Sequence, residues 1–202
     1  MDAIPLEIDS PVAIKAFARQ MTAEFPALNV LINNAGIQRP ENLTKPPDNL
    51  AEMDAMVTTN LLGPIRLISA LLPHLLRQRY SAVMNVTSGL AFVPGAGVPT
   101  YSATKAALHS YTLSLRHQLR GKSTEVIELI PPYVQTDLGP GHGSDPRAMP
   151  LADYIAEVMA ILRDAPDTKE VVVERCKPLR FAAEAGKFDA TFNWLNGTFI
   201  SE

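Results

Sequence analysis

The sequence predicts an α/β fold built on a parallel sheet. Strand-length apolar runs alternate with longer helical patterns along the 202 residues, and no internal repeat interrupts this alternation. Parallel strands need crossover connections, which are right-handed in nearly all known folds. We therefore expect a single domain, residues 1–202, in which helices connect the consecutive strands of one sheet.

Local signals mark where several elements begin and end. Ser10 followed by Pro11 is typical of a helix start, and Pro26 ends that helix. Gly63 and Pro64 predict a kink or break within the longest helical region. The predicted strands span residues 6–8, 29–33, 82–87, 125–130 and 170–174, and the predicted helices span residues 11–25, 49–79, 99–120 and 151–164.

Composition excludes several classes of function. The net charge is −3 without a basic block, which argues against nucleic acid as a main partner. Cys176 is the only cysteine, so no disulfide can form within the chain, and a reducing cytoplasm is the expected location. We find no signal peptide, and the apolar run at residues 67–76 is too short to span a membrane. The four histidines lack the spacing of metal ligands, so we expect no metal site.

Tyr101 and Lys105 are the strongest candidates for chemistry. They are four residues apart, which places the phenol and the ammonium on one face of the predicted helix. A nearby cation favours the phenolate, so we expect the tyrosine pKa to be lowered from its usual value of about 10. Ser88 precedes this pair by 13 residues and closes an apolar strand. Without further support, Tyr-x-x-x-Lys is a weak motif, and the same residues could form a solvated helix face.

Further motifs surround this pair in a recognisable order. They are Asn33-Asn34-Ala35-Gly36 after an apolar run, Asn60-Leu61-Leu62-Gly63, Ser88 at the end of residues 83–88, and residues 131–136, Pro-Pro-Tyr-Val-Gln-Thr. As a set, at about these spacings, they resemble the short-chain dehydrogenase/reductase family over nearly the whole chain. The segments at residues 170–175 and 177–181 resemble the DltE-like branch of that family.

The resemblance implies a Rossmann-like, doubly wound parallel sheet that is truncated at its N-terminus. The family normally opens with a strand, a Thr-Gly-x-x-x-Gly-x-Gly turn and a helix, and the turn would hold the cofactor pyrophosphate. This sequence contains no such turn, and residues 6–8 resemble the family's third strand instead. The first two strands and helices are therefore expected to be missing. A start codon placed too late, a genuinely shortened protein and a removed front segment are all open explanations.

The resemblance also implies roles for four catalytic residues. Tyr101 would give or take a proton at the substrate oxygen, and Lys105 would favour the tyrosinate and bond the nicotinamide ribose. Ser88 would hydrogen-bond the substrate oxygen, and Asn60 would hold a water that links the lysine to solvent. Each has a plainer explanation: Ser88 could cap a turn, and Asn60 could be a structural amide.

A nicotinamide cofactor, NAD or NADP, is the implied partner of these residues. Besides Tyr101 and Lys105, the family pattern assigns adenine contacts to Glu7 and Ile8, with Glu in place of the commoner Asp. It also assigns adenosine ribose contacts to Asn34, Ala35 and Gly36, and carboxamide contacts to Val134 and Thr136. Pro132 replaces the family's usual glycine, so the backbone bend beside the nicotinamide is expected to differ.

Three functions compete on this evidence. The first is an NAD(P)-dependent oxidoreductase acting on a small alcohol or carbonyl compound. The second is a non-catalytic relative that has lost dinucleotide binding. The third, a nucleotide-sugar epimerase or dehydratase, needs a longer chain. The family pattern further implies a homodimer or homotetramer formed by residues 61–79 and 102–119, whose apolar faces include Leu67, Leu71, Leu75, Leu108 and Leu115.

Overall fold

A parallel sheet forms the centre of the molecule. The structure, a computed structural model, describes residues 3–45, 50–139 and 142–199. Its four strands lie side by side in sequence order, and every neighbouring pair is parallel. They are β1 (Val30–Asn33), β2 (Ser81–Val86), β3 (Thr124–Ile130) and β4 (Glu170–Val172). The α/β class and the parallel sheet predicted from the sequence are confirmed.

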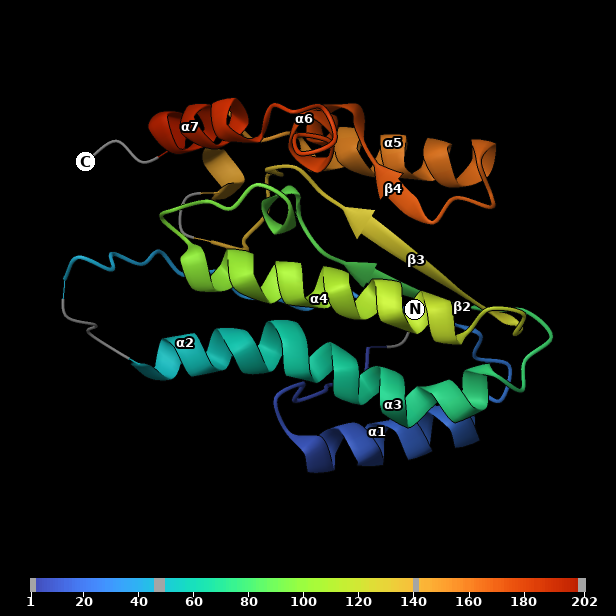
Figure 1. Cartoon of the computed structure of the whole chain (residues 1–202). Helices are drawn as coiled ribbons and strands as arrows, with labels where there is room; N and C mark the ends of the chain where they lie inside the picture. Colours follow the sequence, from blue (N-terminus) through green and yellow to red (C-terminus); the bar gives the residue numbers. More distant parts are fainter. Residues whose placement is uncertain (1–2, 46–49, 140–141, 200–202) are drawn as a thin grey trace.

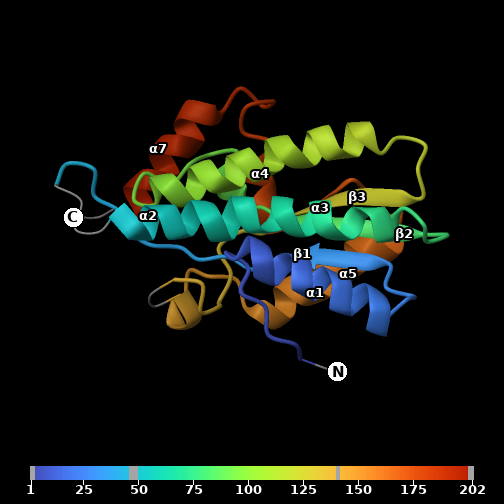
Figure 2. The same cartoon turned by 90° about the horizontal axis from the view of Figure 1, so that it is seen from below.

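Helices cover the sheet on both faces (Figures 1 and 2). The first face carries α1 (Pro11–Glu24), α3 (Gly63–Leu75) and α4 (Pro99–Gln118), and the opposite face carries α5 (Leu151–Asp164). Two further helices follow β4, namely α6 (Lys177–Arg180) and α7 (Phe188–Phe199), and neither was expected from the sequence.

Two cores result from the alternation of side chains along the strands. Val83 and Val126 point toward α1, α3 and α4, whereas their neighbours Met84 and Ile127 pack with α5. Successive strand residues face opposite sides, so each strand contributes to both cores. Glu128 lies on the same face as Val126, which places a carboxylate under α4.

The first predicted strand is not a strand. Residues 6–8 have no ladder partner and run across the start of α3, where Leu6 and Ile8 pack against the first core. The backbone turns there through a hydrogen bond from Ser10 N to Glu7 O at 3.1 Å. A lone extended segment gains no inter-strand hydrogen bonds, so apolar contact decides its course. Ser10 then caps α1 as predicted and accepts a hydrogen bond from Ala13 N at 3.2 Å.

The long helical region is interrupted just before Gly63. Following α2 (Leu50–Val57), residues Thr58–Leu62 form a π-helical turn, and α3 begins at Gly63 with Pro64 in its first turn. Proline lacks an N–H, and its ring crowds the carbonyl group four residues earlier. The wider π-helical turn relieves this crowding. The predicted break is therefore present, although α3 ends at Leu75 rather than at residue 79, and Asn49 lies outside the described residues.

The helical run from Leu50 to Leu75 is long and apolar enough to span a membrane: it has 26 residues and contains an 18-residue stretch with a mean hydropathy of 1.4. The sequence reading considered only residues 67–76 and missed this longer run. Core helices of soluble proteins meet the same criterion, and Leu67, Ile68, Leu71 and Leu75 are buried against the sheet. Packing within the chain accounts for these residues.

The absence of a side chain at Gly63 allows residues 6–8 to pack closely against α3. A Cβ at this position would lie 2.7 Å from Ile8 Cγ1 and 3.0 Å from the Ile8 carbonyl oxygen. We expect Gly63→Ala to lower the free energy of unfolding by about 1–2 kcal/mol, because this overlap outweighs the gain in helix propensity. Urea denaturation measures the change. Gly197→Ala in α7 is the control: a Cβ there meets nothing within 4 Å, so equal or higher stability is expected. Equal changes in the free energy of unfolding for the two variants would contradict the close contact between Gly63 and Ile8.

Candidate active site

The predicted catalytic residues converge where β2 meets the start of α4. Ser88 follows the end of β2 by two residues, and Tyr101 and Lys105 lie in the first two turns of α4. All three side chains are buried, with exposed fractions of 8%, 5% and 4%. The three side chains are thereby brought together in the interior of the protein.

Ser88 lies near two polar groups in the structure. Its hydroxyl is close enough to the Tyr101 phenol to lower the pKa of that phenol, as expected for a serine that shares a substrate oxygen with the tyrosine. Its Oγ also accepts a hydrogen bond from Leu90 N at 3.1 Å and so caps the 3-10 turn Gly89–Ala91. The capping explanation is therefore confirmed, whereas the catalytic role of this hydroxyl stays a prediction.

The expected lowering of the tyrosine pKa is wrong for this structure. Burial raises the pKa of Tyr101 to about 12, and the smaller effect of the nearby Ser88 hydroxyl acts in the opposite direction. Desolvation disfavours the phenolate more strongly than its surroundings stabilise it. Lys105 Nζ lies 5.6 Å from the centre of the Tyr101 ring and is hydrogen-bonded elsewhere. The Tyr101 phenol is therefore neutral near neutral pH and keeps its proton.

Lys105 is held by the end of β2. Its Nζ donates a hydrogen bond to the Val86 carbonyl oxygen at 2.8 Å. Burial lowers the pKa of Lys105 to about 8, because the ammonium loses its hydration. The amine is thus fixed one helical turn from Tyr101 and can gain or lose a proton close to physiological pH.

Asn60 lies in the π-helical turn and is completely buried. Its side-chain amide accepts a hydrogen bond from Ile37 N at 2.8 Å and donates one to Ile37 O at 2.8 Å. It also donates to Thr104 Oγ1 at 3.2 Å. Asn60 therefore joins the loop after β1 to α4, which is the structural role left open by the sequence.

The turn after β1 brings Gly36 beside the catalytic residues. A Cβ on Gly36 would lie 3.4 Å from Asn60 Oδ1 and 3.8 Å from Lys105 Nζ, so a side chain would intrude between them. Asn34 and Ala35 are exposed and leave their side chains free to meet a ligand. Asn33, just before them, donates to Asn85 Oδ1 at 2.8 Å, and its own buried Oδ1 has no hydrogen-bond partner within the part of the chain that the structure describes.

The other predicted cofactor residues lie in different surroundings. Glu7 is exposed, and Ile8 contacts the start of α3. Val134 is buried in the second core and pairs with Met149 in an isolated parallel bridge. Thr136 is half-buried, and its Oγ1 accepts a hydrogen bond from Leu138 N at 3.4 Å. Their roles as adenine and carboxamide contacts stay predictions.

The residues present fit one end of a nicotinamide dinucleotide. Gly36 has no side chain between Lys105 and Asn60, and the buried Oδ1 of Asn33, the last residue of β1, has no hydrogen-bond partner among the described residues. Buried donors at Tyr101, Lys105 and Ser88 suit a hydroxyl-rich ribose and a carbonyl oxygen. These groups match the nicotinamide riboside end, whereas the sequence has no Thr-Gly-x-x-x-Gly-x-Gly turn for the pyrophosphate.

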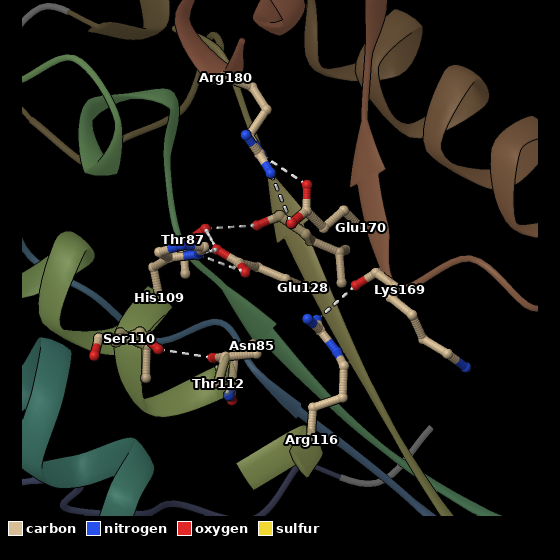
Figure 3. A network of polar contacts seen from close by, with 12 residues as sticks. Asn85, Thr87, His109, Ser110, Thr112, Arg116, Glu128, Lys169, Glu170 and Arg180 are labelled. Atoms are coloured by element: carbon tan, nitrogen blue, oxygen red, sulfur yellow. Dashed lines mark hydrogen bonds and ion pairs between the residues drawn. The ribbon is translucent and has the colours of Figure 1, made fainter. Parts of the chain in front are cut away.

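A buried polar network beside this site was missed by the sequence analysis (Figure 3). Glu128, completely buried in β3, accepts a hydrogen bond from Thr87 Oγ1 at 2.7 Å. His109 Nδ1 of α4 lies 2.9 and 3.0 Å from its two carboxylate oxygens. A glutamate inside an apolar strand, and a histidine one turn beyond Lys105, were the available signals.

The leucines proposed for an interface between subunits are all buried within the chain. Leu67, Leu71 and Leu75 of α3 and Leu115 of α4 pack in the first core, and Leu108 is 1% exposed. Their apolar faces contact the sheet and neighbouring helices, so they give no support to a subunit contact. Self-association stays a prediction, which light scattering of the purified chain can check.

Comparisons with known proteins agree with this geometry. Residues 1–146 match the family model for short chain dehydrogenases, and the chain belongs to this family. More particularly, it belongs to the DltE-like branch. It is 41% identical over 177 residues to the uncharacterized oxidoreductase DltE of Bacillus subtilis (strain 168), covering 86% of this chain and 69% of DltE.

More distant relatives share the same fold. The chain is 29% identical over 151 residues to the 3-oxoacyl-[acyl-carrier-protein] reductase FabG of Vibrio cholerae, covering 75% of this chain but only 61% of FabG. A short chain dehydrogenase from Burkholderia cenocepacia J2315 in complex with NADP superimposes with a TM-score of 0.81 at 22% identity, over 96% of this chain and 80% of that one. A 3-ketoacyl-(acyl-carrier-protein) reductase from Brucella melitensis complexed with NADH gives a TM-score of 0.72 at 25% identity, over 86% and 78% of the two chains.

Proposed function

We propose that this chain carries the catalytic part of an NAD(P)-dependent oxidoreductase that interconverts a small carbonyl compound and its alcohol. The observation that carries the proposal is the shared buried site of Ser88, Tyr101 and Lys105, in which the Ser88 hydroxyl lies near the phenol and Lys105 lies one helical turn from Tyr101. Membership of the short chain dehydrogenase family and neighbours solved with NADP or NADH support it.

The chemistry follows from what each side chain can do. A nicotinamide cofactor, when bound, supplies or accepts the hydride. Reduction leaves negative charge on the substrate oxygen, and the neutral Tyr101 phenol donates a proton to that oxygen. Ser88 Oγ–H hydrogen-bonds the same oxygen and stabilises its developing charge. Lys105, fixed by the Val86 carbonyl, places a cation near the phenolate that remains.

Two features of the cofactor and substrate stay open within this proposal. The choice between NAD and NADP depends on residues that contact the adenosine ribose, where Glu7, Ile8 and Asn34–Gly36 are the candidates. For the substrate we propose a modest-sized, largely apolar carbonyl compound. The competing function is a non-catalytic member of the family.

Carbonyl-dependent oxidation of NADH and NADPH by the purified chain tests the proposal. We expect weak dinucleotide binding, with a dissociation constant above the low micromolar range, so millimolar dinucleotide should be used. A panel of aliphatic and aromatic ketones and aldehydes provides the acceptors. Oxidation that depends on the carbonyl compound and disappears in Tyr101→Phe supports the enzyme. Rates no higher than those of Tyr101→Phe across the panel would favour the non-catalytic alternative.

A further inference from the structure

We infer that Thr87, His109 and Glu128 form a positioning unit that holds the Ser88 turn against α4; this inference rests on the function proposed above. The Glu128 carboxylate is the centre of the unit, and two residues bind to it from two sides: Thr87, which directly follows β2, and His109 on α4 (Figure 3). None of the three residues belongs to the predicted catalytic set.

Burying Glu128 at its position costs free energy. It lies in the middle of β3, completely buried, between apolar strand residues. Taking a carboxylate out of water costs free energy that a buried partner repays only in part, and apolar replacements of similar volume are often neutral or stabilising. The residue is therefore poorly explained by stability alone, and its contacts indicate what it provides.

Those contacts join the elements that carry the catalytic groups. Thr87 Oγ1 donates to Glu128, and the next residue along the chain is Ser88. His109 is one helical turn beyond Lys105 and two beyond Tyr101, on the same face of α4. Fixing Thr87 and His109 on one carboxylate therefore sets the distance between the Ser88 turn and the tyrosine.

The turn after Ser88 holds His109 from the other side. Phe92, which follows the 3-10 turn, packs edge-on against the His109 ring with ring centres 4.6 Å apart. The Arg180 guanidinium lies 4.5 Å from the centre of the Phe92 ring and is paired with Glu170 of β4 at 2.7 Å. Thr87, directly before Ser88, thus contacts Glu128, and Phe92, four residues after Ser88, contacts His109.

Amide hydrogen exchange at Leu90 provides a direct readout, because Leu90 N–H donates to Ser88 Oγ. The decisive variant is His109→Leu combined with Glu128→Leu, which removes the pair and fills its volume with apolar atoms. We expect this double variant to fold with stability close to wild type. Its Leu90 amide should exchange at least tenfold faster, relative to the Ala82 amide, which donates to Asn29 O at the far end of β2.

Thr87→Val tests the same unit with a smaller change, and Thr87→Ser should restore slow exchange because it keeps the hydroxyl. Thr124→Val is the matched control: it removes a buried hydroxyl that contacts Ser81 at 2.8 Å and joins the same two strands at their opposite ends. We expect this control to leave the Leu90 to Ala82 exchange ratio unchanged.

Turnover gives a second readout that separates this inference from the proposed function. In the double variant and in Thr87→Val we expect kcat to fall about tenfold while the KM for the dinucleotide stays within twofold. If the wild-type chain shows no turnover, the proposed function fails, whereas the exchange data still decide whether the unit positions Ser88. Leu90 exchange that rises no more than Ala82 exchange in both variants would overturn the inference.

Discussion

Tyr101→Phe is expected to lower carbonyl-reducing activity by about 100- to 10,000-fold, the usual contribution of a positioned general acid. The substitution removes only the phenolic oxygen of a buried side chain, close to the Ser88 hydroxyl. The aromatic ring keeps its packing at the start of α4, so the fold should survive. Initial rates at saturating carbonyl compound and millimolar NADPH, with circular dichroism to verify folding, measure the effect.

Tyr111→Phe is the matched control for this experiment. Tyr111 lies on the same helix and is half-buried, and its phenol is near the Ser69 hydroxyl rather than near a predicted catalytic residue. We expect its activity to stay within a factor of two of the wild type. Near-normal turnover of Tyr101→Phe, or an equal loss in both variants, would show that Tyr101 is not the proton donor.

Lys105→Met is expected to have the second largest effect, because it should stabilise the fold while removing activity. Burial lowers the pKa of Lys105 to about 8 from 10.5, which means that the folded protein holds a charged amine at a cost. Losing the hydrogen bond to the Val86 carbonyl offsets part of the gain. We expect a net increase in the free energy of unfolding of roughly 1–3 kcal/mol at pH 7.

The pH dependence of this difference follows from the sign of the shift. Below a pH of about 8 the amine is charged in both the folded and the unfolded chain, so the full penalty is present. Between about pH 8 and 10.5 the folded protein releases the proton first, and wild-type stability rises relative to the methionine variant. The raised pKa of Tyr101 acts in the opposite direction only above pH 10, where the unfolded phenol begins to ionise.

Urea denaturation of the wild type and Lys105→Met at pH 7 and pH 9.5 tests the expected gain in stability and its dependence on pH. The stability difference should shrink by about half or more between the two pH values. Lys122→Met, at an exposed lysine, is the control and should change stability by less than about 0.5 kcal/mol at either pH. A methionine variant that is less stable than wild type at pH 7 would contradict the assignment of a buried, charged Lys105.

Local sequence signals predicted most of the architecture. The Ser10–Pro11 helix start, the break before Pro64 and the helix at Leu151–Asp164 are all present, since each depends on capping, proline geometry or periodicity within one segment. The prediction of a strand at residues 6–8 was wrong, because an extended segment forms a strand only when a neighbouring strand pairs with it. The small helices α6 and α7 follow β4 and were not found.

The sequence could predict which residues belong to the candidate site, but not how these residues lie relative to one another. Family resemblance placed Ser88, Tyr101 and Lys105 in one site, and the structure brings them together at the end of β2 and the start of α4. The network of Thr87, His109 and Glu128 could not be found in this way, since its members come from three elements that are adjacent only in the folded chain.

By itself, the sequence determined the alternation of strands and helices, the parallel sheet and the spacing of tyrosine and lysine on one helix face. Tertiary structure alone decided the proton affinities of that pair. Proximity of an ammonium favours a tyrosinate, yet Tyr101 is buried deeply enough that desolvation raises its pKa, and the same burial lowers that of Lys105. Burial depends on the packing of all surrounding elements, so residue spacing could not reveal which effect prevails.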